Sequence, residues 1–250
     1  MPESEVVELT RRLVSINSEN PGSSEASVAS FVAGWLKDNG VSDVRIADAA
    51  PGRPNVIGRI PGDPAVPPLA LVGHMDTVPV GEGWTVDPFA GVISGDRLYG
   101  RGSADMKGGL AAAMMAVRDT VRKGGGLRRT LLLCGTADEE GTHMLGAVRL
   151  IRDGVIDKDT LILAPEGTGM EVIIAHKGVM WFELTTKGRM SHAGSPEVGV
   201  DAVHGMAELI REVKAMITEL PFSHPLVGKP TVTFGVIRGG IKTNVVPDTC

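Results

Sequence analysis

Several features that mark other classes of protein are scarce in this sequence of 250 residues. It has two cysteines, Cys134 inside an apolar run and Cys250 as the last residue. Two such thiols do not make the disulfide framework that holds small secreted domains together, which indicates a reducing compartment. No apolar run approaches the length that spans a membrane, and the first residues lack the basic and apolar regions of a signal peptide. We therefore expect a cytoplasmic location.

An excess of positive charge is also missing. The net charge is -5 and there is no basic tail, so we expect neither nucleic acid nor an acidic membrane as a partner. The composition is 42% hydrophobic, 22% charged and only 4% aromatic, which is typical of a soluble globular protein with a large core. This length allows one large domain or two smaller ones.

The first two thirds of the chain alternate between helical and strand patterns. Apolar residues at helical spacing predict helices over residues 5–16, 26–38, 105–123 and 143–152. Apolar runs of strand type cover residues 41–47, 55–60, 69–73, 129–135 and 160–163. Helices between the later strands indicate an α/β fold with a largely parallel sheet, whose sites lie beyond the carboxyl ends of the strands.

Three of these strand-like runs end in side chains that can bind metals. His74 ends the first, Asp138, Glu139 and Glu140 follow the second, and Glu166 follows the third. Taken singly, each has a plainer explanation, such as a surface histidine or an exposed acidic turn. Together they would gather like charges at one edge of the sheet, which two divalent cations would offset. The combined pattern therefore favours a metal site.

The pair His74 and Asp76 has the spacing of a ligand and its support. Side chains two residues apart in an extended strand leave on the same face. Asp76 could therefore accept a hydrogen bond from one imidazole nitrogen while the other nitrogen binds a metal.

A glycine-rich stretch before the helix at residue 105 raises a nucleotide-binding alternative. Gly100 and Gly102 begin the pattern, but Asp105 stands where a third glycine is required, and its charge would repel a pyrophosphate. The sequence also lacks the G-x-x-x-x-G-K-[ST] motif of a phosphate-binding loop. Taken alone, Asp105 is better explained as a helix N-cap.

Four motifs in order give the sequence a clear family resemblance. They are Gly-His-Met-Asp-Thr-Val-Pro over residues 73–79, Gly-Arg-Gly-x-x-Asp-Met-Lys-Gly-Gly over 100–109, Asp-Glu-Glu-Gly over 138–141, and Glu-x-Thr over 166–168. This set resembles the co-catalytic zinc peptidases and deacylases, which include acetylornithine deacetylase, succinyl-diaminopimelate desuccinylase, aminoacylase and glutamate carboxypeptidase. The match extends over essentially the whole chain.

The resemblance implies a role for each motif residue. Asp105 would bridge two divalent ions. We expect these to be zinc, with cobalt or manganese as alternatives. His74 and Glu166 would complete one metal position, and Glu140 would serve the other. Glu139 would be the general base. Asp76 would orient His74. One departure is visible, since the family usually has Glu-Pro-Thr where this chain has Glu166-Gly167-Thr168, but the spacing from Glu166 to His176 is that of the family.

A second domain is predicted from the change of pattern near residue 179. We expect a catalytic metal-binding domain over residues 1–178 and an α+β lid or dimerisation domain, here incomplete, over 179–250. The second domain should contain strands over 179–186, 231–236 and from 243 onward, with a helix over 198–220. By resemblance, His192 would reach the active site of a partner chain and steady the oxyanion, Asn244 would contact the substrate, and the protein would be a homodimer.

The implied reaction is hydrolysis of the amide bond of a small N-acyl amino acid by a metal-activated water. The alternatives are a dipeptidase or carboxypeptidase of the same family and, less favoured, a non-catalytic binding relative. The family's last histidine ligand has no counterpart before the sequence stops at Asp248-Thr249-Cys250. We therefore expect these residues to be the N-terminal part of a longer protein, and to be inactive or nearly so alone.

Overall fold

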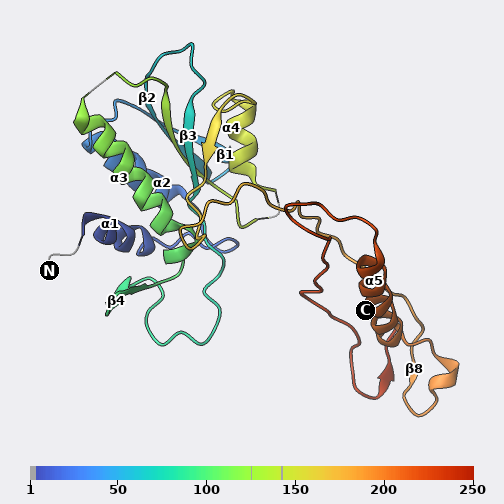
Figure 1. The fold of residues 1–250 in the computed structure, drawn as a ribbon. Helices are drawn as coiled ribbons and strands as arrows, with labels where there is room; N and C mark the ends of the chain where they lie inside the picture. Colours follow the sequence, from blue (N-terminus) through green and yellow to red (C-terminus); the bar gives the residue numbers. More distant parts are fainter. Residues whose placement is uncertain (1–3, 125, 142) are drawn as a thin grey trace. The chain divides into compact units, whose positions relative to one another are not determined.

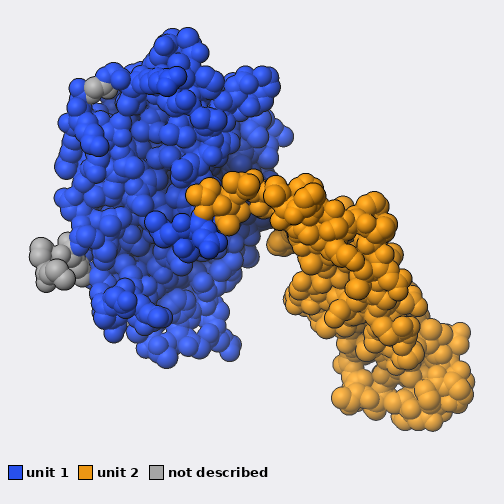
Figure 2. All heavy atoms as spheres, viewed as in Figure 1, with its two compact units in different colours: residues 1–171 blue, residues 172–250 orange. Residues whose placement is uncertain are grey.

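The computed structural model describes residues 4–124, 126–141 and 143–250. The chain divides into two compact units, Met1–Glu171 and Val172–Cys250 (Figure 2). The sequence places this boundary after residue 178, and the structure places it between Glu171 and Val172.

Unit 1 contains a five-stranded sheet with helices on both faces (Figure 1). Its elements are α1 (Glu5–Val14), α2 (Ala26–Asp38), β1 (Asp43–Ala50), β2 (Arg53–Ile60), β3 (Leu69–His74), β4 (Val92–Ser94), β5 (Arg97–Tyr99), η1 (Ser103–Lys107), α3 (Gly108–Lys123), β6 (Leu131–Thr136), α4 (Leu145–Arg152) and β7 (Leu161–Leu163). The expected α/β class is confirmed. The short hairpin of β4 and β5 is an addition, because the sequence shows only an irregular loop before residue 95.

The sheet is mixed, and its parallel part carries the predicted ligands. The strand order is β1-β2-β6-β3-β7. β3 runs parallel to β6 and to β7, whereas β2 is antiparallel to both β1 and β6. The three strands that precede His74, Glu139 and Glu166 therefore end at one edge of the sheet.

Strand alternation divides the core of unit 1 between the two faces of the sheet. Successive side chains leave opposite faces, so Leu133 packs with the residues of α2 and α3 while Cys134 packs with Leu150 of α4. Figure 1 shows α2 and α3 on one side of the sheet and α4 on the other. Because both faces are covered, β6 is apolar throughout rather than alternating.

Unit 2 is built around one helix. Its elements are β8 (Ser191–His192), η2 (Pro196–Val198), α5 (Ala202–Glu219) and β9 (Val245–Val246). α5 begins at an N-cap, Asp201, whose side chain accepts the main-chain N–H of His204 at 2.9 Å. Its buried residues, Ala202 and Met206, pack with Cys250. Among the residues described in either unit, no helix is long and apolar enough to cross a bilayer.

Two strands that the sequence predicts in unit 2 are not found, and this prediction is wrong. Residues 179–186 and 231–236 form no strand in the structure. A strand exists only where a neighbouring ladder pairs its main-chain groups. The last residue of the predicted strand over 179–186 does pair, because Thr186 and Cys250 exchange main-chain hydrogen bonds of 2.8 and 3.2 Å. Val179 and Met180, at the start of this predicted strand, are 81% and 82% exposed, so their apolar character alone does not make a strand.

Candidate metal centre

Five potential ligands meet at the carboxyl edge of the parallel strands. His74 is the last residue of β3, Glu139 and Glu140 lie on the turn that follows β6, and Glu166 follows β7. Asp105 comes from η1, which leads into α3. Parallel strands in register end side by side, and His74 pairs with Thr136 at the end of β6. The expectation that strand ends would gather these side chains agrees with the geometry.

The imidazole of His74 lies at the middle of this cluster. Its Nε2 is 3.0 Å from Asp105 Oδ1, 3.8 Å from Glu139 Oε2 and 3.8 Å from Glu166 Oε1. Two triplets have donor atoms within 4.8 Å of one another, namely His74 with Glu139 and Glu140, and His74 with Asp105 and Glu166. One imidazole with several carboxylates is a donor set that suits zinc and related divalent ions.

The other nitrogen of His74 is held by Asp76, but not through the atom that the sequence suggests. Nδ1 lies 2.9 Å from the main-chain oxygen of Asp76 and 3.6 Å from its carboxylate Oδ1. A carbonyl oxygen can only accept, so Nδ1 carries a proton and donates it. In the neutral ring, Nε2 then has its lone pair directed at the carboxylate cluster, which is the tautomer of a metal ligand.

The Asp76 carboxylate binds the neighbouring turn instead. Oδ1 accepts the main-chain N–H of Glu139 at 3.1 Å, and Oδ2 accepts that of Glu140 at 3.0 Å. Asp76 is completely buried. It therefore supports the imidazole through its main chain and the acidic turn through its side chain.

The electrostatics of the cluster favour a bound cation. Burial first, and then the charge of Asp105, raise the pKa of Glu140. Burial also raises the pKa of Glu166, opposed by His74 and reinforced by Asp105 and Glu139. For His74, burial opposes protonation, but the charges of Asp76, Glu139 and Glu166 and the contact with Asp105 outweigh it and raise the pKa. Divalent cations would offset this repulsion, so the residues present fit a metal site.

Asp105 is not the N-cap of the helix that follows it. The N-cap of α3 is Lys107, the N-cap of η1 is Gly102, and neither element has a side-chain cap hydrogen bond. The Asp105 side chain is 69% exposed, and its Oδ1 is directed at His74. The residue therefore supports the sequence-based choice of a ligand over a cap.

The glycines near Asp105 have a packing explanation that needs no nucleotide. Gly102 has φ 80, and a Cβ there would lie 2.5 Å from Thr77 Cγ2. A Cβ on Gly109 would collide with the main-chain oxygen of Pro165. These positions require glycine because neighbouring segments approach the main chain closely.

One buried lysine close to the cluster could not be identified from sequence. Lys107 is completely buried, and its Nζ donates to the main-chain oxygen of Ile16 at 2.7 Å. Burial lowers its pKa to about 8, against the opposing effect of the Asp76 charge. A lysine in a polar Asp-Met-Lys sequence reads as exposed, and only the packing of α1 beneath η1 encloses it.

The remaining two predicted site residues lie together in unit 2. His192 of β8 pairs with Val245 of β9, and the main-chain N–H of Ala193 donates to the oxygen of Asn244 at 3.1 Å. The main-chain N–H of Gly194 donates to His192 Nδ1 at 3.0 Å. In the neutral ring the proton is therefore on Nε2, which is free to act as a donor.

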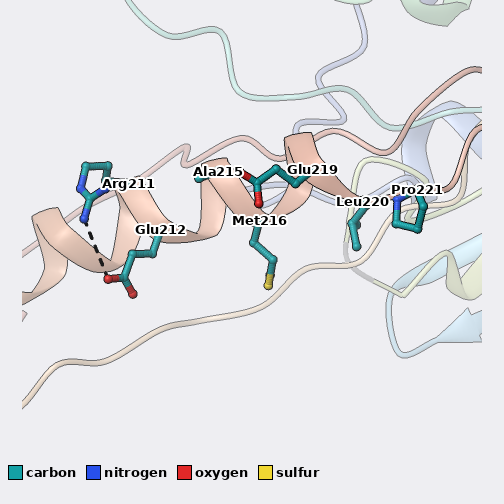
Figure 3. A pocket seen from close by; sticks show the side chains of 7 residues that line it. All are labelled: Arg211, Glu212, Ala215, Met216, Glu219, Leu220 and Pro221. Atoms are coloured by element: carbon teal, nitrogen blue, oxygen red, sulfur yellow. Dashed lines mark ion pairs between the residues drawn. The ribbon is translucent and has the colours of Figure 1, made fainter.

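Unit 2 also contains a hollow of ≈ 400 Å³ at the carboxyl end of α5 (Figure 3). Its lining residues are Arg211, Glu212, Ala215, Met216, Glu219, Leu220 and Pro221. Arg211 pairs with Glu208 at 2.9 Å and lies 3.9 Å from Glu212. None of these seven residues carries an imidazole, thiol or hydroxyl group.

Comparison with known proteins identifies the relatives of this chain. Residues 70–241 match the model of peptidase family M20/M25/M40. The chain is 34% identical over 259 residues to acetylornithine deacetylase of Photorhabdus laumondii, a match that covers 98% of this chain and 65% of the relative. It is 30% identical over 272 residues to a probable succinyl-diaminopimelate desuccinylase of Staphylococcus aureus, with coverages of 98% and 65%. The chain thus spans slightly less than two thirds of each of these curated relatives.

Solved structures show the same fold. A tripeptidase of Staphylococcus aureus superposes with a TM-score of 0.64 at 22% identity, covering 98% of this chain and 63% of that one. A dinuclear metal-binding peptidase of Bacillus subtilis superposes with a TM-score of 0.51 at 18% identity, covering 98% and 61%.

Proposed function

Since the chain belongs to peptidase family M20/M25/M40, we propose that the protein is a metal-dependent hydrolase that cleaves the amide bond of a small N-acyl amino acid. The observation that carries this proposal is the gathering of His74 with carboxylates from three other segments in two groups of three residues, and within each group the donor atoms lie within 4.8 Å of one another. Relatives named as a deacetylase and a desuccinylase support the substrate class.

The cluster would hold two divalent ions. We expect these to be zinc, with cobalt or manganese as alternatives. His74, Asp105 and Glu166 would bind one ion, and Asp105 and Glu140 would bind the other. Asp105 suits the shared position because its side chain is exposed and reaches Nε2 of His74 at 3.0 Å. When bound, such a pair of ions lowers the pKa of a water molecule and polarises the substrate carbonyl.

Glu139 would act as the general base. Its carboxylate is partly exposed, at 38%, and its Oε2 is 3.8 Å from His74 Nε2. The hydrogen bond from its main chain to Asp76 holds the residue in place while its side chain stays free. It would take a proton from the attacking water as the new C–O bond forms. It would then give that proton to the amine nitrogen as the C–N bond breaks.

By family resemblance, His192 would donate to the developing oxyanion in the active site of a partner chain, and Asn244 would contact the substrate. In the neutral ring of His192 the proton is on Nε2, because Nδ1 accepts the main-chain N–H of Gly194. Asn244 directly precedes β9, and its main-chain oxygen accepts the N–H of Ala193. We further propose a homodimer through unit 2, in which His192 serves the partner's site, and a cytoplasmic location. The dimer rests on family resemblance, and the location on a sequence with two free cysteines.

A dipeptidase or carboxypeptidase is the second candidate, because it would use the same centre with a different grip on the substrate. The Staphylococcus aureus structure with the same fold is that of a tripeptidase, which is why we keep this candidate. Rates measured with N-acetylornithine, N-succinyl-diaminopimelate and dipeptides, using the protein as its gene encodes it, separate the two. A clear preference for dipeptides would overturn the deacylase proposal.

Replacing Glu139 with Gln tests whether the protein is an enzyme of this type. We expect Glu139→Gln to lose roughly 10²–10⁴-fold in kcat while it still binds divalent ions. Glu8→Gln is the matched control, because Glu8 is exposed on α1 and, within the part of the chain that the structure describes, pairs with Arg11 across a helix turn. A protein that binds metal but turns over no amide, with or without Glu139, would instead be a binding relative.

A further inference from the structure

A buried asparagine joins the ends of β3 and β6, two of the three strand ends that carry the metal-site residues. Asn20 lies between α1 and α2 and is 6% exposed. Its main-chain N–H donates to the oxygen of Thr77 at 2.7 Å, directly after Asp76. The sequence indicates only a helix break at this position, followed by Pro21 and Gly22.

The amide of Asn20 has each of its groups engaged. Nδ2 donates to Asp76 Oδ2 and to Asp138 Oδ1, both at 2.9 Å. Oδ1 accepts from Arg53 Nη2 at 3.0 Å. An NH₂ group has two hydrogens, one for each carboxylate, and a carbonyl oxygen suits a guanidinium donor. The neighbours therefore fix which way the amide is turned.

Of the two carboxylates that Asn20 bridges, one holds the turn that contains Glu139 and Glu140, and the other belongs to the residue directly before that turn. Asp76 accepts the main-chain N–H groups of those two glutamates. Asp138 precedes them with φ 61, a left-handed conformation, and its N–H donates to Glu25 Oε1 at 3.1 Å. A shift between Asp76 and Asp138 would therefore move the acidic turn relative to His74.

Charge explains why an amide occupies this position. Asp76, Asp138 and Glu25 bring three carboxylates into a buried region, and Arg53 pairs with Glu25 at 2.6 Å while it lies 3.9 Å from Asp138. Asn20 supplies two donors without adding a charge. A carboxylate of the same shape would face two like charges at hydrogen-bond distance, which is strongly unfavourable when buried.

We propose that Asn20 is a positioning residue of the metal centre, which bridges Asp76 and Asp138 and so sets Glu139 and Glu140 relative to His74. The inference rests on the proposed function, because it presumes that the cluster binds divalent ions. It assigns Asn20 no contact with the substrate.

The test is Asn20→Asp in the protein as its gene encodes it. This change keeps the shape of the side chain but replaces two donors with an acceptor. We expect Zn²⁺ and Co²⁺ to bind roughly 10–100-fold more weakly, as is usual for groups that support metal ligands, measured by competition with a chromophoric chelator. With N-acetylornithine as substrate, kcat should fall while KM changes little. Ser15→Asp is the control for the added charge, since Ser15 is exposed just after α1 and its hydroxyl donates to the main-chain oxygen of Arg12 at 2.8 Å rather than to a carboxylate.

Two further variants separate positioning from folding. Asn20→Asp combined with Asp138→Asn exchanges donor and acceptor and restores the net charge, so we expect it to regain part of the lost metal affinity. If Asn20→Asp does not fold, as judged by circular dichroism of the metal-free protein, Asn20→Ala removes the bridge without burying a charge and is expected to show the same loss of affinity. Wild-type metal affinity and kcat in Asn20→Asp, or in Asn20→Ala where Asn20→Asp does not fold, would overturn the inference. A wild-type protein that binds no divalent ion would overturn the proposed function and this inference with it.

Discussion

The Asp76 carboxylate accepts the main-chain N–H of Glu140 at 3.0 Å, which ties the segment after β3 to the turn after β6. The neighbouring Glu139 makes the same kind of bond at 3.1 Å. A residue whose position suggests a support for His74 alone thus also positions the predicted base and a predicted ligand. The hydrogen bonds to Glu139 and Glu140 depend on a carboxylate, because only that group offers two acceptor oxygens here.

Asp76→Asn is therefore expected to damage the centre although the side chain keeps its shape. The amide must place its NH₂ against at least one main-chain N–H, so the acidic turn shifts. We expect kcat and the affinity for Zn²⁺ each to fall roughly 10–100-fold, measured by steady-state kinetics and chelator competition. Asp43→Asn on β1, whose side chain is 49% exposed, is the control. Unchanged metal binding would show that the turn is held without Asp76.

Gly109→Ala is expected to disturb the segment that carries Glu166. The added methyl would collide with the main-chain oxygen of Pro165, the residue before Glu166. Overpacking of this kind costs about 1–3 kcal/mol, and chemical denaturation should show it together with weaker metal binding. Gly34→Ala on α2 is the control. A Cβ there meets no atom within 4 Å, so the variant should gain up to about 1 kcal/mol from better helix propensity. Equal behaviour of the two variants would contradict the packing argument.

Arg53→Ala is expected to lower stability because it leaves Glu25 buried without its cation. The Glu25 side chain is 1% exposed and bonds Arg53 at 2.6 Å, and removing one partner of a buried pair costs about 3–5 kcal/mol. Adding Glu25→Gln to Arg53→Ala should restore part of this loss, since the amide oxygen can still accept the N–H of Asp138. Burial raises the pKa of Glu25, so the loss should also shrink as the pH falls and the carboxyl is protonated. A double variant no more stable than Arg53→Ala would refute this assignment.

Cys134 is expected to make the protein less stable as the pH rises into the alkaline range. Burial raises the pKa of its thiol from 9.0 to about 12. Between these values the unfolded chain releases the proton while the folded chain retains it. The contribution of this thiol is therefore fully present below pH 9 and is lost as the pH rises toward 12. Urea unfolding at a series of pH values should show a steeper decline for the wild type than for Cys134→Ala.

Thiol labelling gives an independent check of the same assignment. In a Cys250→Ser background, iodoacetamide at pH 8 should label Cys134 only after unfolding, because the thiolate is the reactive form. Rapid labelling of the folded protein would mean that the residue is accessible.

Much of the centre could be predicted because its signals are local. His74 and Glu166 are recognisable as candidate ligands from short apolar runs followed by a donor side chain, and parallel strands bring such ends together without further information. The choice of Asp105 as a ligand rather than a cap needed the family resemblance, since both interpretations use the same residue at a helix start.

Other features depend on contacts between segments far apart in the chain. The strand predicted over residues 179–186 is wrong because an apolar run becomes a strand only when another segment pairs with it. The mixed character of the sheet likewise follows from the pairing of β2 with β6, which no local pattern reveals.

Short segments of the sequence predict which side chains are candidate ligands and that these side chains lie at or after strand ends, because strand period and chain order are local properties. What supports these side chains depends on contacts that form in the tertiary structure. Asn20 and Lys107 are polar residues in ordinary turn and helix-start sequences, and they acquire their environment when the segments after α1 and around η1 pack against the strand ends. That burial depends on three-dimensional packing, so it could not be read from either segment alone.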